Sequence, residues 1–215
     1  MNVIVVEDQS LFRQLIVKMC SEKFNVVGEA GSGQEALDIC RETKPDILLL
    51  DIRIPEPDGI SVAETLIEEQ SSLRVLAVSA KLDSVTVFRL LKSGVHGYVN
   101  KFSDELDTVM RAMDAIARGE PYFSESFAQV KEEIRKNPLA FHKILSNKEL
   151  ELLPMFSKGL DDGTIGQLVT LSDKTVRWHR RNVMKKLELH ATTELMRYGI
   201  AQGFWDIEEA TGLEN

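Results

Sequence analysis

Short apolar runs alternate with amphipathic stretches over the first 120 residues of the chain. Runs of four or five residues that are typical of β-strands lie at Val3–Val6, Asn25–Glu29, Ile47–Leu50, Val75–Val78 and Gly97–Asn100. Helical patterns follow them at about residues 10–20, 33–43, 60–69, 83–93 and 103–118. Because the apolar residues of most strands are consecutive, both faces of the strands are expected to be buried, as in a parallel sheet. The pattern predicts a doubly wound α/β domain with a five-stranded parallel sheet over residues 1–120.

From about residue 144 onward, the pattern indicates helices alone. Ser146 and Glu149 carry the signature of a capping box, in which two side chains satisfy backbone N–H groups at a helix start. That helix is expected to end near Gly159. Other candidate N-caps are Ser32, Ser103, Asp161, Ser172 and Thr192. We predict a small all-α domain of four helices over residues 144–215, preceded by a partly helical linker over residues 121–143.

Composition and charge narrow the class of protein. The chain has 215 residues, 43% of them hydrophobic, and a formal net charge of −8 from 26 basic and 34 acidic residues. This balance is typical of a globular protein and argues against a general coat for nucleic acid or membranes. Apolar runs such as Ile47–Leu50 are far shorter than the roughly 18 residues of a membrane span. We therefore expect a cytoplasmic protein with no membrane partner.

Polar and charged side chains follow four of the five predicted strands. Glu7 and Asp8 come after the first strand, Asp51 after the third, Ser79 after the fourth and Lys101 after the fifth. Because ligands of open α/β sheets bind at the carboxyl ends of the strands, these side chains are expected to converge. Three carboxylates in one crevice repel each other, and Mg²⁺, which prefers oxygen ligands, would relieve that repulsion. Asp51 is the candidate nucleophile, since carboxylates form acyl phosphates, and Ser79 and Lys101 could hold phosphoryl oxygens.

With the loop Pro55–Gly59, this set of residues resembles the receiver domain of bacterial response regulators over essentially all of residues 1–120. The resemblance implies that Asp51 accepts a phosphoryl group from a histidine kinase. It also implies that Asp8, Asp51 and the backbone carbonyl of Arg53 bind Mg²⁺, with Glu7 helping through water.

The same resemblance assigns the remaining residues of the site. Ser79 and Lys101 would contact the phosphate, and Tyr98 would be the aromatic residue that turns inward on activation. Arg53 and Lys81 are long cations that each follow a phosphate-site residue by two positions. We hypothesise that they crowd and screen the acyl phosphate and lengthen its lifetime. The alternative is that both side chains simply point into water.

A basic helix is the main feature of the second domain. Within residues 174–187 there is no acidic residue, and the basic ones are Lys174, Arg177, Arg180, Arg181, Lys185 and Lys186. On a helical wheel, Val176, Val183 and Leu187 share a face that is expected to be buried. The opposite face carries Lys174, Arg177, Trp178, Arg181 and Lys185. Such a helix could enter a major groove as part of a helix-turn-helix, although a solvated charged face is the alternative for a basic helix taken alone.

Residues 145–203 resemble the LuxR-type four-helix DNA-binding domain, and the whole chain therefore resembles a response regulator of the NarL/FixJ class. The matching segments are Leu145–Leu153, Gly159, Leu171–His179, Asn182–Val183, Lys186–Leu187 and Thr193–Leu195. By position, the resemblance implies base contacts from Arg177, Trp178 and Arg181 and backbone contacts from Lys174, Thr175 and Lys185. It also implies dimer contacts from the last helix, through Leu195, Met196, Tyr198 and Ile200.

The chain departs from this pattern at the first helix of the motif. The family usually has Ser-Asn-Lys-Glu-Ile-Ala where residues 161–166 read Asp-Asp-Gly-Thr-Ile-Gly. Two glycines in a helix cost about 1 kcal/mol each relative to Ala, and two aspartates put negative charge near a surface that should approach phosphate. Thr192 stands where Arg is usual, and the last ten residues are acidic. These changes predict weak nonspecific DNA affinity and greater reliance on dimerisation.

These observations predict a transcription regulator in which a histidine kinase phosphorylates Asp51. Phosphorylation would control the formation of a homodimer and its sequence-specific binding to double-stranded DNA. The alternative is a phosphorylation-switched regulator whose divergent helical domain binds a partner protein. An enzyme acting on an external substrate is not expected, because the sequence shows no further nucleophile–base pair and no cofactor motif.

Overall fold

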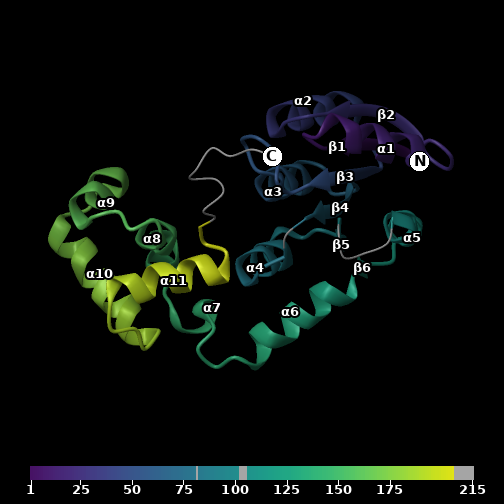
Figure 1. The fold of residues 1–215 in the computed structure, drawn as a ribbon. Helices are drawn as coiled ribbons and strands as arrows, with labels where there is room; N and C mark the ends of the chain where they lie inside the picture. The colour runs from purple at the N-terminus through teal and green to yellow at the C-terminus, as the bar shows by residue number, and fades with distance from the viewer. Residues whose placement is uncertain (81, 102–105, 206–215) are drawn as a thin grey trace. The chain divides into compact units, whose positions relative to one another are not determined.

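A computed structural model describes residues 1–80, 82–101 and 106–205 (Figure 1). The described chain forms two compact units. The first contains the residues up to Leu82 and Thr86–Lys131, and the second contains Asp83–Val85 and the residues from Glu132 onward. Among the described residues, the helices are too short or too polar to cross a membrane.

The first unit is built on a parallel sheet of six strands in the order β2-β1-β3-β4-β5-β6. Its strands are β1 (Asn2–Val6), β2 (Asn25–Ala30), β3 (Ile47–Asp51), β4 (Arg74–Ser79), β5 (Gly97–Asn100) and β6 (Tyr122–Phe123). Every residue of β3 is buried, as expected for a strand that is covered on both faces. The doubly wound parallel sheet and the five predicted strands are confirmed, and β6 is an additional strand that the sequence pattern did not predict.

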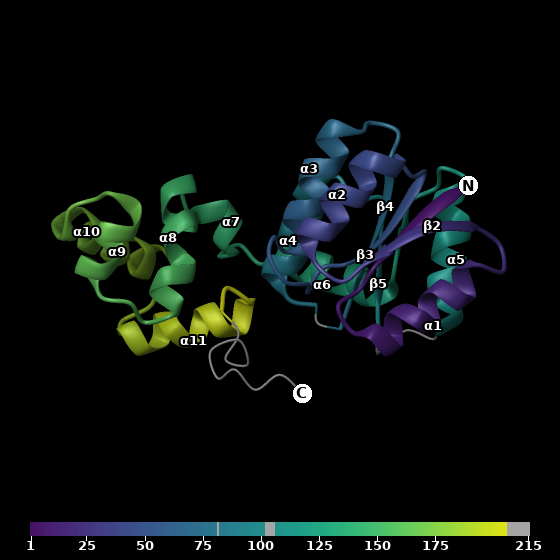
Figure 2. The same cartoon turned by 90° about the horizontal axis from the view of Figure 1, so that it is seen from above.

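Helices cover both faces of this sheet, with α1 and α5 on one face and α2, α3 and α4 on the other (Figure 2). Their bounds are α1 (Ser10–Cys20), α2 (Gly33–Thr43), α3 (Gly59–Glu69), α4 (Ser84–Ser93) and α5 (Leu106–Ala117). The core under α1 and α5 combines strand residues such as Leu49 and Val78 with Ile16 and Met113 of the helices. Ser32 caps α2 as predicted, because its side chain accepts a hydrogen bond from the backbone N–H of Glu35. Ser103 lies outside the described residues.

The chain after α5 joins the sheet before it forms the next helix, α6 (Glu125–Lys136). In β6, Phe123 pairs in parallel register with Tyr98 of β5, and the backbone N–H of Ser124 donates to the Tyr98 carbonyl at 3.0 Å. Phe127 of α6 is buried, with its ring centroid 5.4 Å from that of Tyr98 and 4.7 Å from that of Phe123. The first part of the predicted linker is therefore anchored on the strand that carries Tyr98.

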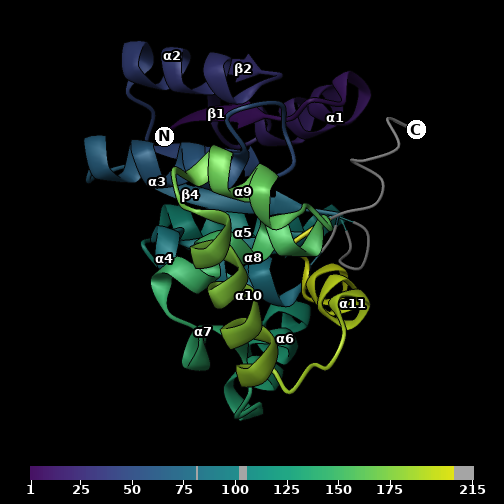
Figure 3. The ribbon, with the colours of Figure 1, turned by 90° about the vertical axis from the view of Figure 1, so that its left-hand side faces the viewer.

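The second unit is helical, and Figure 3 shows its helices from the side. They are α7 (Phe141–Ile144), α8 (Asn147–Ser157), α9 (Asp162–Val169), α10 (Asp173–Lys186) and α11 (Thr192–Gln202). α10 packs against α9 and α8, and α11 packs against α8. Gly199 permits the last contact, because a Cβ at this position would overlap the hydroxyl of Ser157. The four predicted helices are present, and the short α7 precedes them.

Most of the predicted helix starts in this unit are confirmed. Ser146, Asp161 and Ser172 each cap the helix that follows, and Ser146 does so in a capping box with Glu149. The prediction for Thr192 is wrong, because Thr192 is already the first residue of α11. The carboxylate of Glu194 instead accepts the backbone N–H of His190 at 2.7 Å and that of Ala191 at 3.2 Å.

Candidate functional site

Four neighbouring strands end at one edge of the sheet, and each ends in or is followed by a polar or charged residue there. Glu7 and Asp8 directly follow β1, Asp51 is the last residue of β3, Ser79 is the last residue of β4 and Lys101 directly follows β5. The register of the sheet aligns these ends, since Asp51 lies beside Val78 and Ser79 lies beside Asn100. The convergence predicted from the strand pattern is therefore present.

Lys101 lies between two buried carboxylates. Its Nζ is 2.7 Å from Asp51 Oδ2 and 2.5 Å from Glu7 Oε2, and only 6% of its side chain is exposed. The other oxygen of Asp51 accepts the backbone N–H of Arg53 at 2.9 Å. The backbone N–H of Lys101 donates to the Ser79 carbonyl at 2.8 Å, which ties the end of β5 to β4. The Asp51 carboxylate is thus held in one orientation by contacts to both of its oxygens.

Glu7, Asp8 and Asp51 form a cluster of oxygen ligands. Each offers one carboxylate oxygen, and these oxygens all lie within 4.8 Å of one another. Burial and then the charge of Asp51 raise the pKa of Glu7 to about 7, although Lys101 acts in the opposite direction. Asp8 is exposed while Glu7 and Asp51 are buried, so that an ion here would keep contact with solvent. Hard oxygen ligands with partial access to water fit Mg²⁺.

The loop after β3 is fixed beside Asp51 by close packing and by an ion pair. A Cβ on Gly59 would overlap the backbone carbonyl of Asp51, so glycine allows α3 to begin at this point. Asp58 caps α3, and its carboxylate also accepts from Arg89 of α4 at 3.0 Å. This packing fixes the end of the loop of residues 55–59 beside the end of β3.

The remaining predicted residues of the first unit that the structure describes lie on or just after the same strands. Ser79 and Tyr98 are both fully buried, and the Tyr98 ring packs against Phe127. Arg53 is exposed, whereas Lys81 lies outside the described residues. The hypothesis that Arg53 and Lys81 lengthen the lifetime of a phosphoryl group therefore stays a prediction.

In the second unit, α9 and α10 form a helix-turn-helix. Val176 and Val183 of α10 are fully buried and Leu187 is 6% exposed, which confirms the predicted core face. The opposite face is exposed at Lys174, Arg177, Trp178, Arg181 and Lys185. Trp178 is 59% exposed, and its ring stacks edge-on against that of His179 with centroids 4.8 Å apart. The helix therefore presents a basic surface with one large aromatic side chain at its centre.

Comparison with known proteins finds a family match for each of the two units. The family described as "Response regulator receiver domain" matches residues 3–113, and that described as "Bacterial regulatory proteins, luxR family" matches residues 143–199. BvgA, a virulence transcription regulator of Bordetella pertussis, is 32% identical over 198 residues, covering 91% of this chain and 94% of BvgA. This chain belongs to the LuxR-type response regulators. The response regulator GacA of Pseudomonas viridiflava is 29% identical, covering 95% of this chain and 98% of GacA.

Solved structures extend the likeness to both units of this response regulator. A LuxR-family two-component response regulator from Aurantimonas sp. SI85-9A1 is 28% identical with a TM-score of 0.59, covering 63% of this chain and 98% of that one. A structure of two RcsB dimers bound to two parallel DNAs is 25% identical with a TM-score of 0.63. It covers 92% of this chain and 96% of the RcsB chain.

Two residues with predicted contacts to DNA or to a second protomer also have a place inside their own unit. Thr175 is half-buried, and its hydroxyl lies 2.8 Å from that of Ser172 while its backbone N–H donates to the same oxygen. Thr175 thus supports the cap of α10, and its predicted contact with the DNA backbone stays a prediction. Leu195 is fully buried in its own unit, so it does not offer the dimer contact expected of it. Tyr198, on the same helix, is half-buried.

The prediction that the glycines of α9 only destabilise the helix is wrong for Gly166. Gly166 was expected only to weaken the helix, but a Cβ there would lie 2.6 Å from the Leu171 carbonyl oxygen. Glycine at this position therefore permits the close approach of α9 to the turn before α10. Sequence patterns within one helix could not indicate this, because the contact joins two elements.

Asp162 is a residue of the response regulator whose contacts were not predicted. Its carboxylate pairs with Arg177 and Arg180, both on α10. The sequence offered only a weak signal, namely two arginines three positions apart and an acid at the start of the preceding helix. The pairing depends on how α9 crosses α10, which no local pattern reports.

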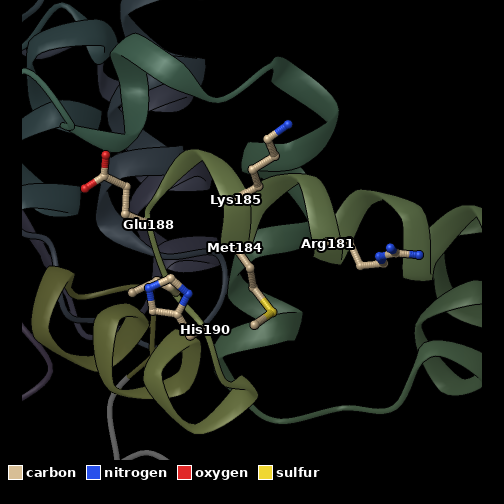
Figure 4. A pocket seen from close by; sticks show the side chains of 6 residues that line it. Arg181, Met184, Lys185, Glu188 and His190 are labelled. Atoms are coloured by element: carbon tan, nitrogen blue, oxygen red, sulfur yellow. The ribbon is translucent and has the colours of Figure 1, made fainter.

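A cavity of about 580 Å³ lies at the C-terminal end of α10. It is lined by Arg181, Met184, Lys185, Glu188, Leu189 and His190. Figure 4 shows the Arg181 and Lys185 side chains extending away from the helix in different directions. Two of the predicted DNA-binding cations therefore line a cavity to which Met184 and Leu189 contribute apolar surface.

Proposed function

We propose that this chain is a transcription regulator that is switched by phosphorylation of Asp51. The observation that carries the proposal is a buried carboxylate, held by Lys101 at 2.7 Å within a cluster of three acids, in the same chain as a helix-turn-helix with an exposed basic face. In this proposal, residues 1–120 are the receiver domain, residues 121–143 the linker and residues 144–215 the DNA-binding domain.

The proposed reaction takes place on Asp51. A carboxylate oxygen of Asp51 attacks the phosphorus of a phosphohistidine on the kinase, so that a P–O bond forms, the P–N bond breaks and the imidazole leaves with a proton. Lys101 is placed to turn from the carboxylate oxygen toward an oxygen of the transferred group. The buried hydroxyl of Ser79, at the end of β4, would bind a second oxygen. The reaction is a switch and does not consume an external substrate.

The acidic cluster supports Mg²⁺ as the cofactor. Its ligands would be Asp8, Asp51 and the Arg53 carbonyl, with Glu7 acting through water. Bound there, Mg²⁺ would supply positive charge against the negative charge of the phosphoryl group. The raised pKa of Glu7, which results first from burial and then from Asp51, supports the need for added positive charge at this edge of the sheet.

The output we propose is DNA binding by a homodimer. Ser79 and Tyr98 would respond to the phosphoryl group and change the surface of the receiver around them. The DNA-binding residues would be Lys174, Thr175, Arg177, Trp178, Arg181 and Lys185. Arg177, Trp178 and Arg181 would face base edges, and the others would hold the backbone. Because bacterial DNA is the target, we place the protein in the cytoplasm.

Phosphoryl transfer is tested by labelling the protein with a small phosphodonor. Asp51→Asn should abolish incorporation, because the amide cannot form the acyl phosphate. Asp46→Asn is the matched control, since Asp46 is an exposed aspartate just before the same strand and should label like the wild type. Equal labelling of Asp51→Asn and wild type would show that the acceptor has been assigned wrongly.

DNA binding is tested separately with mixed-sequence and genomic duplexes, with and without Mg²⁺ and the phosphomimetic beryllofluoride. We expect binding that strengthens with the mimic and weakens as salt is added. Binding in neither state, even at low salt, would favour the alternative of a partner protein for the helical domain. The match of residues 143–199 to the luxR family supports the DNA reading.

A further inference from the structure

Asp162 lies between two arginines of the next helix. It is the first residue of α9, and its carboxylate faces α10. Asp162 Oδ1 lies 2.8 Å from Arg180 Nε, and Asp162 Oδ2 lies 3.2 Å from Arg177 Nε. Each carboxylate oxygen therefore accepts from a different arginine, and one acid binds two guanidinium groups.

The two arginines differ in their surroundings. The Arg180 side chain is 11% exposed, donates to the Leu160 carbonyl at 2.7 Å and lies over the Phe156 ring at 4.4 Å. The Arg177 side chain is 65% exposed, although its Nε is held by Asp162. Arg180 thus fixes the carboxylate inside the helix-turn-helix, and the carboxylate in turn fixes the direction of an arginine on the outer surface.

This arrangement prepares Arg177 for one kind of contact. With Nε bound to Asp162, the two terminal amino groups of the guanidinium remain for a ligand. A guanidinium held in one plane can donate both to O6 and to N7 of guanine, whereas a freely rotating one pays more side-chain entropy for the same two bonds. We propose that Asp162 is a positioning residue that orients Arg177 to select guanine at one position of the DNA site. This rests on the proposed DNA binding and adds the base that Arg177 reads.

The acid has an opposite effect on affinity. Its negative charge lies near the surface that approaches phosphate, so it weakens binding to every duplex regardless of sequence. Asp162 therefore lowers the affinity for every duplex while it increases the discrimination between bases. The two effects can be separated by experiment, because one depends on sequence and the other does not.

Asp162→Asn is the test variant. Asparagine keeps the shape of the side chain but has one acceptor oxygen instead of two. The buried Arg180 should retain that oxygen, which leaves the amide NH₂ facing the Nε–H of Arg177, donor against donor. The fold is then maintained while Arg177 loses its support. The full chain with beryllofluoride is used to select sites from randomised duplexes, and the affinities of the selected site and its single-base variants are measured.

The wild type should prefer guanine at one position by about tenfold or more, and Arg177→Ala should abolish that preference. Asp162→Asn should reduce it to within about threefold at the same position while binding to all duplexes strengthens. The double variant that combines Asp162→Asn with Arg177→Ala should lose no more of the guanine preference than Arg177→Ala alone. Asp173→Asn removes an equal charge from an exposed position of α10 and should strengthen binding without changing base preference.

An unchanged guanine preference in Asp162→Asn, or a loss at a position other than the one set by Arg177, would overturn the inference. A wild-type protein that binds no duplex at low salt would instead overturn the proposed function, so the two failures are distinguishable. Arg180→Gln provides a second check on folding, since it disturbs the buried pair directly. If Arg180→Gln loses helical structure and Asp162→Asn does not, the selectivity change in the latter is assigned to Arg177.

Discussion

At the scale of single residues, the site of the first unit depends on one cation between two buried acids. Lys101 contacts both Glu7 and Asp51, and all three side chains are almost completely removed from solvent. Removing one member of a buried charged group leaves the others uncompensated, which costs more than the interaction itself contributes. Lys101 therefore has a structural role in the resting protein in addition to its proposed contact with phosphate.

Lys101→Met should lower the stability of the first unit by about 3–5 kcal/mol, because two carboxylates then face each other without a cation. Millimolar Mg²⁺ should restore part of the loss, since a bound cation supplies the missing charge. The measurement is calorimetric unfolding of the full chain in EDTA and in Mg²⁺. Both tryptophans, Trp178 and Trp205, lie in the second unit. A parallel thermal scan of tryptophan fluorescence therefore reports the unfolding of the second unit, and the calorimetric transition that has no counterpart in that scan belongs to the first.

Lys18→Met is the control for this experiment. Lys18 is an exposed residue near the end of α1, and its replacement should change stability by no more than about 0.5 kcal/mol. A Lys101→Met protein as stable as the Lys18→Met protein in EDTA would contradict the assigned role. Equal stability of Lys101→Met in EDTA and in Mg²⁺ would show that the cluster does not bind the ion in that variant.

At the scale of elements, contacts between helices can decide whether a residue stabilises the fold, even where its helix propensity predicts the opposite. Gly166 is the clearest case, because alanine is the better helix former and yet its Cβ would lie 2.6 Å from a carbonyl oxygen of the following turn. Gly163, three residues earlier in the same helix, would place a Cβ 3.2 Å from the capping carboxylate of Asp161. The two glycines therefore form a matched pair within one helix.

Gly166→Ala should destabilise the second unit by about 1–3 kcal/mol, because the carbonyl of Leu171 must move. Gly163→Ala should change stability by less than about 1 kcal/mol, since helix propensity is gained while the Asp161 cap adjusts. Denaturant unfolding followed by tryptophan fluorescence reports on this unit. Equal effects for the two variants would mean that packing against the turn does not limit residue 166.

A buried acid joins the start of α8 to the end of α10. The Glu149 carboxylate accepts from the Ser146 backbone N–H at 2.7 Å and from Lys186 Nζ at 2.6 Å. Burial raises the pKa of Glu149, but the hydrogen bonds from Lys186 and Ser146 outweigh it, and the pKa lies below its ordinary value. Because the folded pKa is lower than the unfolded one, this acid stabilises the folded state above about pH 4.5 and loses that effect as pH falls.

Glu149→Gln should therefore lower the stability of the second unit by about 1–3 kcal/mol at pH 7. The difference from wild type should shrink as pH decreases below about 4.5, where Glu149 of the unfolded chain takes up a proton while the folded carboxylate still resists protonation. Urea unfolding at a series of pH values, followed by tryptophan fluorescence, measures both. A difference that stays constant down to pH 3 would indicate lost packing rather than lost charge.

The sequence predicted long, strongly patterned elements well and short or contact-dependent features poorly. Ile47–Leu50 was recognisable as a buried strand because a short apolar run that follows a proline and ends at a polar residue is typical of a strand covered on both faces. β6 has only two residues, which is too short for a periodic pattern, and it is recognised by its pairing with Tyr98 of β5. Thr192 had the residue type of a cap, but Ala191 holds the N-cap position and the Glu194 carboxylate accepts the backbone N–H groups just before the helix.

At the scale of the whole molecule, an acidic chain carries one basic helix. The net charge is −8, yet residues 174–187 contain no acid. The sequence could predict the receiver site because parallel strand ends meet at one edge of a sheet, whatever the details of packing. It could not predict that Asp162 holds Arg177, because that pair depends on two helices crossing. Of the exposed cations of α10, Lys174, Arg181 and Lys185 have no side-chain ion pair within the described residues.

The salt dependence of DNA binding should report how many protomers bind at once. The two cations per protomer assigned to the DNA backbone, Lys174 and Lys185, correspond to a slope of log affinity against log salt of about −2, and a dimer should give about −4. If phosphorylation acts by forming dimers, beryllofluoride should double the slope, and Asp51→Asn should keep the shallow slope with or without it. If the mimic only exposed the helix of a monomer, affinity would rise at an unchanged slope. A steep slope without the mimic would contradict control through dimerisation, because the dimer would then bind in the unphosphorylated state.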